Sequence, residues 1–329
     1  MQSTTTNSTL RQRSRPTTGC WSPSTPTWPC SPGPVVRVAD RHTPIPLTVW
    51  AVSQTHPRFQ RLNRYTPESL AHPARMLPAL ARHIITTFTE PGDLVVDPMC
   101  GIGTTLVEAA HLGRRALGVE YEPRWAGIGR ANAALAHTQG ATGTIQLITG
   151  DSRHLPALAP ESARGKASLV LTSPPYGKAT HGTVDADRVN GVRKRDYTYS
   201  TGRPGRVGNL AAADLTDLLT GFTEILTGAA ALLRPGGIIA IAVRPYRQDG
   251  ELIDLPGAIL HSAQRVGLVR AGRAAALLAG LREGRLVPRT TFFALHNART
   301  AHAAGTPLHI TAHEDILLLT PPPVARPQA

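Results

Sequence analysis

The feature that most constrains the fold of this chain is an alternation of short apolar segments with longer amphipathic segments. Apolar segments typical of buried strands lie at 93–97, 115–120, 144–151, 167–173, 238–243 and 315–320. Apolar residues at helical spacing occur at 73–88, 103–113, 123–138 and 215–233. This alternation predicts an α/β fold with a doubly wound, mostly parallel sheet, whose binding site lies along the carboxyl ends of the strands.

Three of the predicted strands end in an acidic residue. Asp97 ends the first, Glu120 the second and Asp151 the third. Gly101 and Gly103 follow the first strand, where they allow a tight turn and a close approach of a ligand to the backbone. A carboxylate after the second strand suits the hydroxyl groups of a ribose, and Asp151 can accept from an adenine amino group. Because the strand ends share one sheet edge, these residues predict a cofactor that contains a nucleoside.

A resemblance to a known family appears when the motifs DPMCGIGTT, GVE, GD and TSPPY are taken in this order. They resemble the S-adenosylmethionine-dependent amino methyltransferases that modify exocyclic nitrogens of DNA bases. The upstream segment HPARMLPAL resembles the part of that family that wraps the methionine end of the cofactor. The resemblance covers roughly residues 47–320, and it implies a Rossmann-like class I methyltransferase fold with a reversed terminal strand and S-adenosylmethionine as cofactor.

The resemblance also assigns residues to the two ligands. The cofactor would contact His72, Asp97, Pro98, Cys100, Gly101, Gly103, Thr104, Glu120, Asp151 and Ser173. The catalytic tetrapeptide, which would hold the target base, is Ser173, Pro174, Pro175 and Tyr176.

The tetrapeptide has a physical rationale in this role. Two prolines exclude both a helix and ladder pairing, so the backbone is stiff where the fourth strand ends. An exocyclic amine is a poor nucleophile because its lone pair is delocalised into the ring. If Ser173 Oγ and the Pro174 carbonyl accept its two N–H hydrogens, the lone pair can point at the methyl group. Tyr176 would stack on a base that has been extruded from the duplex.

The charge of the chain points to a polyanionic partner. The formal net charge is +13, which favours a nucleic acid, although an Arg-rich and Ala-rich composition can also reflect genome base composition alone. The family resemblance implies DNA as this partner, with RNA as the alternative. The segment 178–209 has a net charge of +4 and no hydrophobic periodicity, so we predict a long irregular substrate loop there. Basic residues interleaved with tyrosines suit phosphate contacts and base stacking. The predicted contacts are Lys178, Arg188, Arg193, Lys194, Arg195, Arg203 and Arg206.

The remaining segments set the predicted domain boundaries. Residues 1–45, rich in Ser, Thr and Pro, bury too little apolar surface to repay their ordering entropy, so a disordered tail is expected. A methyltransferase domain is expected at 46–322, with 270–313 as a candidate recognition region, and a second tail at 323–329. The three cysteines form no CxxC pair, and no apolar run reaches about 18 residues. We therefore expect a cytoplasmic protein without a membrane span, disulfide scaffold or metal site.

Several functions compete. Ser173 at the first tetrapeptide position resembles the cytosine-N4 members of the family, with adenine N6 as the alternative within it. Enzymes that methylate guanine N2 in tRNA share DP.CG.G loops and a PPY element, and Cys100 favours them. A third hypothesis is an inactive nucleic-acid-binding module, which the intact acids and tetrapeptide oppose. A cognate restriction enzyme is a candidate partner of the DNA-modifying function.

Overall fold

The computed structural model describes residues 46–177, 208–248, 251–289, 292–303, 305 and 308–322, together with the backbone of two strands at 183–187 and 191–195. The chain divides into two compact units, 1–35 and 36–329, and every described residue belongs to the second. The two tails predicted at 1–45 and 323–329 lie outside the described residues.

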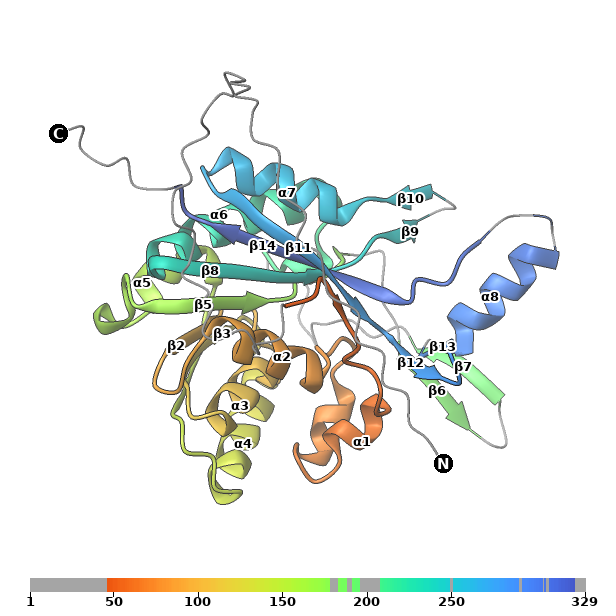
Figure 1. The fold of residues 1–329 in the computed structure, drawn as a ribbon, viewed down its shortest axis with the longest axis horizontal. Helices are drawn as coiled ribbons and strands as arrows, with labels where there is room; N and C mark the ends of the chain where they lie inside the picture. Colours follow the sequence, from red (N-terminus) through yellow and green to blue (C-terminus); the bar gives the residue numbers. More distant parts are fainter. Residues whose placement is uncertain are drawn as a thin grey trace, which may run out of the picture. The chain divides into compact units, whose positions relative to one another are not determined.

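A sheet of eight strands forms the centre of the described part (Figure 1). Its order is β1-β11-β14-β8-β5-β2-β3-β4. The bounds are Val49–Trp50 (β1), Leu94–Asp97 (β2), Arg115–Glu120 (β3), Ile145–Thr149 (β4), Ala167–Thr172 (β5), Leu233–Val243 (β8), Val269–Leu277 (β11) and His313–Thr320 (β14). β14 is antiparallel to both β8 and β11, whereas the other pairs in this sheet are parallel. This topology confirms the predicted doubly wound, Rossmann-like methyltransferase fold with its last strand reversed.

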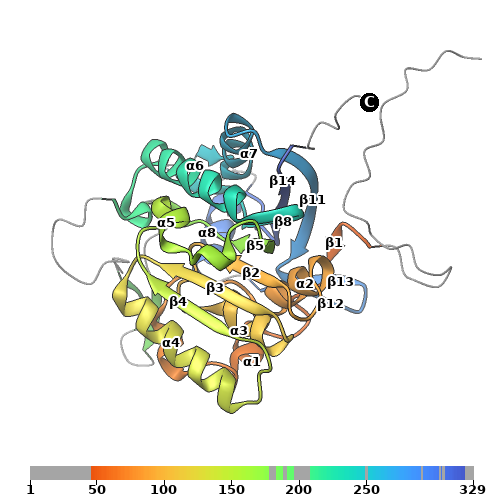
Figure 2. The ribbon, with the colours of Figure 1, turned by 90° about the vertical axis from the view of Figure 1, so that its left-hand side faces the viewer.

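Helices cover both faces of the sheet (Figure 2). One face carries α2 (Pro78–Phe88), α3 (Thr104–His111) and α4 (Pro123–Thr138); the other carries α5 (Leu155–Leu158), α6 (Leu215–Leu232) and α7 (Leu255–Arg265). A hydrophobic core lies on each face of the sheet, and successive residues of a strand point alternately into one core and the other. Val95 packs in the core with α2 and α3, whereas Leu94 and Val96 pack in the core with α6 and α7. The strands are therefore apolar throughout, as expected for a sheet buried on both sides.

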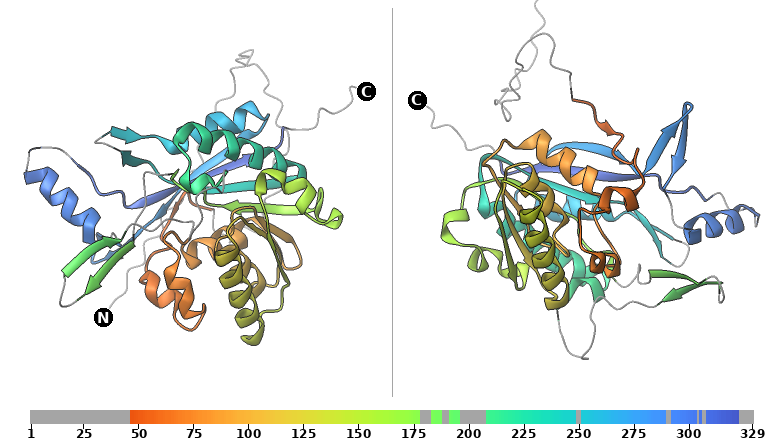
Figure 3. Two further views of the ribbon diagram at one scale, coloured as in Figure 1. Left: turned by 180° about the vertical axis from the view of Figure 1, so that it is seen from behind. Right: turned by 90° about the horizontal axis from the view of Figure 1, so that it is seen from below.

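Shorter elements surround this core. They are the helices α1 (Pro57–Arg61) and α8 (Phe292–Ala303), and the antiparallel pairs β6 (Thr183–Asp187) with β7 (Gly191–Arg195), β9 (Tyr246–Gln248) with β10 (Glu251–Ile253), and β12 (Ala279–Arg282) with β13 (Arg285–Pro288). Single 3₁₀ turns occupy Pro67–Ala71, Ser152–His154, Glu161–Ala163 and Leu210–Ala212. In Figures 1 and 3 the green β6–β7 pair and the blue helix α8 lie on the side toward which the parallel strands point.

Three expectations differ from this architecture. The segment 178–209 is not irregular throughout, because the β6–β7 hairpin forms within it, with Asp185 opposite Arg193 in register. Cross-strand positions of opposite charge favour such a pairing, and hydrophobic periodicity does not detect them. The strand expected at 238–243 begins earlier, at Leu233, and it contains Gly236 with φ +76° and a shift of register against β5. The helix expected at 73–88 begins only at Pro78, which occupies its first turn.

The segment 270–313, for which the sequence predicted no elements, holds β11, the β12–β13 hairpin and α8. No helix in the part that the structure describes is long and apolar enough to cross a membrane.

Candidate active site

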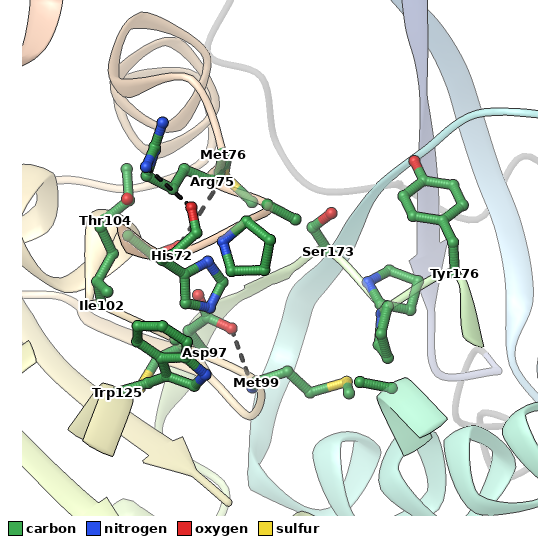
Figure 4. A pocket seen from close by; sticks show the side chains of 18 of the residues that line it. His72, Arg75, Met76, Asp97, Met99, Ile102, Thr104, Trp125, Ser173 and Tyr176 are labelled. Atoms are coloured by element: carbon green, nitrogen blue, oxygen red, sulfur yellow. Dashed lines mark hydrogen bonds between the residues drawn. The ribbon is translucent and has the colours of Figure 1, made fainter. Parts of the chain in front are cut away.

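A pocket of about 960 Å³ lies at the carboxyl ends of the parallel strands. It contains most of the site residues predicted from sequence: His72, Asp97, Pro98, Cys100, Gly101, Thr104, Glu120, Asp151 and Ser173 to Tyr176. In Figure 4, Ser173 and Tyr176 lie on one side of it, and His72, Asp97, Thr104 and Trp125 on the other. The structure therefore brings the predicted cofactor residues and the tetrapeptide to one cavity, of a size typical for small-molecule sites.

The glycine turn after β2 takes a backbone conformation that favours glycine. Gly101 and Gly103 have φ of +53° and +81°. A Cβ on Gly101 would lie 3.1 Å from His72 Nε2, so the turn also allows His72 to approach closely. Gly103 precedes α3 and packs against Gly129 of α4. It is not among the residues that line this pocket, and its predicted contact with the cofactor stays a prediction.

Glu120 ties this turn to the end of β3. Its Oε2 accepts a hydrogen bond from the Gly101 N–H and its Oε1 from the Glu122 N–H, both at 2.8 Å. Burial raises the pKa of Glu120 to about 7. Each carboxylate oxygen has a further lone pair, so hydroxyl groups of a ribose remain acceptable partners.

Asp97 is 3% exposed and its Oδ1 accepts from the Met99 N–H at 3.1 Å. Burial raises the pKa of Asp97 to about 6. Between the two acids lies Cys100, whose pKa is raised by burial and by the negative charges of Asp97 and Glu120. The Cys100 thiol therefore stays protonated near neutral pH and serves as a small apolar wall, without nucleophilic character.

Asp151 differs in position from the sequence expectation. β4 ends at Thr149, and Asp151 instead caps the short turn Ser152–His154 by accepting from the Arg153 N–H at 3.0 Å. Its carboxylate also pairs with the Arg153 guanidinium at 2.5 to 3.0 Å. Burial acts to raise the pKa of Asp151, but the hydrogen bonds from Arg153 outweigh it and lower the pKa. This carboxylate is thus held as a charged acceptor at the rim of the pocket.

The tetrapeptide end of the pocket contains residues that the sequence interpretation missed. The Tyr176 ring packs edge-on against Tyr246, with centroids 5.8 Å apart, and the Arg244 guanidinium carbon lies 5.9 Å from its centroid. Glu314, the second residue of β14, lines the same pocket. Arg244 directly follows the buried strand β8, so the strand-end rule that found Asp97 would have found it too.

The opposite end also contains residues that were missed. Trp125 is 1% exposed and packs edge-on against His72, with ring centroids 4.7 Å apart. Burial lowers the pKa of His72 to about 4, so its imidazole is neutral at pH 7. Arg61 and Arg75 line the pocket as well. Among the described residues, no three His, Cys, Asp or Glu side chains gather as metal ligands would.

Part of this arrangement, the glycine turn together with Asp97 and Glu120, lies in a region that matches a known family. A family model described as DNA methylase matches residues 2–128, which include the glycine turn and Glu120 and end before Ser173. Over these residues the chain is similar to the DNA methylases. The family and the sheet topology imply S-adenosylmethionine as the cofactor of the pocket.

Individual relatives act on different nucleic acids. The tRNA (guanine(10)-N2)-dimethyltransferase of Methanocaldococcus jannaschii is 32% identical over 123 residues, 37% of this chain and 34% of that protein. The type II methyltransferase M.BglII of Bacillus subtilis is 32% identical over 83 residues, 25% of this chain and 21% of that protein. Both matches therefore span about a third or less of the relative. The crystal structure of TrmN from Thermus thermophilus has 18% identity and a TM-score of 0.46, over 80% of this chain and 53% of that one.

The residues present fit the implied cofactor. S-adenosylmethionine carries a sulfonium and an ammonium cation, and the pocket presents the buried carboxyl groups of Asp97 and Glu120. Ile102 and Trp125 add apolar walls for the uncharged parts of the ligand. Because a buried carboxyl group becomes more favourable as an anion beside a cation, the raised pKa values of both acids are consistent with a cationic ligand.

Proposed function

We propose that this chain transfers a methyl group from S-adenosylmethionine to an exocyclic amino group of a nucleic-acid base, and that the target is cytosine N4 in DNA. One observation carries the proposal: Ser173 to Tyr176 line the same pocket as Asp97 and Glu120. A base amine held by the tetrapeptide therefore shares a cavity with the cofactor. The bound cofactor would supply an electrophilic methyl group. The amine nitrogen bonds to the methyl carbon as the carbon–sulfur bond breaks, the sulfonium becomes a neutral thioether that leaves, and the methylated nitrogen loses one of its N–H protons to water.

The tetrapeptide prepares the amine. Ser173 Oγ and the Pro174 carbonyl accept its two N–H hydrogens, which draws the nitrogen toward a tetrahedral geometry and localises its lone pair. Pro174 and Pro175 have no N–H to donate and fixed φ angles, so the acceptors need no reorganisation when the base arrives. These groups act by position and polarity, without a covalent intermediate.

Tyr176 provides the surface on which the base stacks. Its ring is fixed by the edge contact with Tyr246 and by the nearby Arg244 guanidinium. An aromatic ring that is already immobilised loses little side-chain entropy when a base stacks on it. The base reaches this ring only after extrusion from the duplex.

The β6–β7 hairpin is the proposed nucleic-acid contact. β7 contains Arg193, Lys194 and Arg195, and the segment leaves directly from the tetrapeptide. Its other predicted basic residues, Lys178, Arg188, Arg203 and Arg206, lie outside the described residues. Basic side chains at this place would neutralise phosphates on either side of an extruded base. The type II relatives also support a cognate restriction enzyme as a partner.

A second candidate is methylation of guanine N2 in tRNA. It is favoured by the identity to the tRNA dimethyltransferase of M. jannaschii. Methylation of adenine N6 is a third, favoured by a 32% identical match to the DNA adenine methyltransferase YhdJ of Escherichia coli. Ser173 at the first position of the tetrapeptide is our reason to favour cytosine.

The test is a nucleoside analysis of cells that express the chain. Their DNA and tRNA are digested separately and analysed by mass spectrometry, beside cells that express Pro174→Ala. N4-methylcytosine in DNA, dependent on Pro174, is the expected product. N6-methyladenine in DNA would show that adenine is the target, and N2-methylguanine in tRNA would show that guanine is. The absence of any new methylated nucleoside would contradict the proposal.

A further inference from the structure

Arg61, the last residue of α1, is a buried arginine that lines the cofactor side of the pocket. Only 8% of the residue is exposed. Its two terminal nitrogens each lie 3.4 Å from Thr104 Oγ1, and Nη2 also donates to the Met76 carbonyl. The guanidinium lies 4.8 Å from the centroid of the Tyr65 ring. Burial lowers the pKa of Arg61 to about 10, so the group is still a cation at neutral pH.

No carboxylate in the described part of the chain forms an ion pair with Arg61. Glu108 interacts electrostatically with Arg61. It is already engaged by Arg64 at 2.8 Å, by Arg82 at 3.0 Å and by the Tyr65 hydroxyl at 2.8 Å. This cluster therefore has more positive than negative charge before Arg61 is counted. A buried guanidinium that contacts only a hydroxyl, a carbonyl and a ring lacks the anion that would offset its desolvation.

The position of Arg61 indicates which anion it receives. Thr104 is the first residue of α3, and the N–H groups in the first turn of a helix have no partners within the helix and favour negative charge. S-adenosylmethionine has one anionic group, the carboxylate of its methionine part. We infer that Arg61, together with the first turn of α3, binds this carboxylate, while Asp97 in the same pocket receives a cationic group of the ligand.

The inference rests on the implied cofactor and not on which base is methylated. It is tested by calorimetry with two ligands, S-adenosylmethionine and decarboxylated S-adenosylmethionine, which differ in the carboxylate alone. Wild type should bind the carboxylate-bearing ligand roughly 10- to 100-fold more tightly, the usual range for a charged hydrogen-bonded pair. Arg61→Gln should lose most of this preference through weaker binding of S-adenosylmethionine, with the decarboxylated ligand bound as before.

A matched control is Arg58→Gln. Arg58 lies on the same short helix and is also among the residues around the pocket, but it is exposed, whereas Arg61 is buried. The Arg58→Gln substitution removes the same charge as Arg61→Gln and should leave the preference for S-adenosylmethionine over the decarboxylated ligand intact. If Arg61→Gln lowers the affinity for both ligands equally, the inference is wrong and Arg61 has a structural role. A wild-type preference for S-adenosylmethionine below tenfold would overturn the inference, whether or not the variant folds. DNA binding is measured as well: if Arg61→Gln weakens only the binding of a DNA duplex, Arg61 binds a phosphate and the inference is wrong.

None of these measurements involves methyl transfer. If ligand discrimination follows the expectation while no base is methylated, the proposed function fails and the carboxylate site stands.

Discussion

Glu120, the last residue of β3, and Gly101, in the turn that follows β2, are joined by a 2.8 Å hydrogen bond from the Gly101 N–H to the Glu120 carboxylate. The bond makes Glu120 part of the glycine turn as well as a candidate partner of the ribose. The shape of the turn therefore depends on an acid that ends a different strand.

The first prediction concerns this acid and its neighbour. Replacing both Asp97 and Glu120 by Ala should weaken binding of S-adenosylmethionine, because each substitution removes a charged hydrogen-bond partner worth about 1.5 to 3 kcal/mol. Calorimetry measures the affinities directly. Equal affinities in wild type and double variant would contradict the cofactor assignment, and Glu90→Ala, at an exposed acid that does not line the pocket, provides a matched control.

The second prediction is a pH dependence. Burial raises the pKa of Glu120 from 4.5 to about 7, so the folded, ligand-free protein binds a proton more readily than the unfolded chain. Its contribution to the free energy of unfolding is present in full below pH 4.5 and is lost as the pH rises to about 7. Binding of a cationic cofactor, which prefers the ionised acid, should instead strengthen over that interval.

Chemical denaturation at a series of pH values measures how the free energy of unfolding changes with pH, and calorimetry at the same pH values measures how cofactor affinity changes. In Glu120→Gln the side chain does not titrate, so both quantities should depend less on pH than in wild type. If stability and cofactor affinity change with pH in this variant as they do in wild type, another group causes the pH dependence.

The third prediction distinguishes cytosine from guanine through Arg244 and Glu314. Cytosine presents acceptors at N3 and O2, which suit a guanidinium, whereas guanine presents an N1–H donor, which suits a carboxylate. For cytosine as substrate, Arg244→Gln should lower kcat/KM by an amount equivalent to about 1 to 3 kcal/mol, the range for a good base contact. Glu314→Gln should then have the smaller effect. The reverse order of effects would favour guanine.

The fourth prediction concerns the hairpin that follows the tetrapeptide. Replacing Arg193, Lys194 and Arg195 together by Ala should weaken DNA binding similarly for all sequences, because phosphate contacts carry no sequence information. The slope of log affinity against log salt should flatten by about 0.9 for each phosphate that is no longer neutralised, with cofactor affinity unchanged. If the slope equals that of wild type, the protein binds phosphates elsewhere, and 270–313 becomes the next segment to test.

The parts of this fold that were predictable from sequence are those with local signals. β3 and α4 have the bounds that the sequence predicted, because an apolar run ends at Glu120 and Pro123 starts a helix with regular apolar spacing. The acids at strand ends were found by the same means, since one rule places all of them at one sheet edge.

Arg244 apart, the missed residues Arg61 and Glu314 have no local signal. Arg61 belongs to a helix of five residues, too short to show a periodicity, and its partner Thr104 lies 43 positions away. Glu314 lies in a strand that runs against its neighbours, so it faces the site from the beginning of the strand, where the strand-end rule does not look. Asp151 was expected at the end of β4, but the strand stops two residues earlier and the acid caps a turn.

The most direct test of the central claim, that one pocket holds the cofactor at one end and the target base at the other, is a paired measurement on Tyr176→Ala and Pro174→Ala. Binding of S-adenosylmethionine is measured by calorimetry, and transfer of its labelled methyl group to DNA is measured on the same preparations. We predict near wild-type cofactor affinity with methyl transfer lowered at least about tenfold, as expected for loss of stacking or of a positioned acceptor. Cofactor affinity that falls in parallel with the rate, or a rate that does not change, would contradict the account.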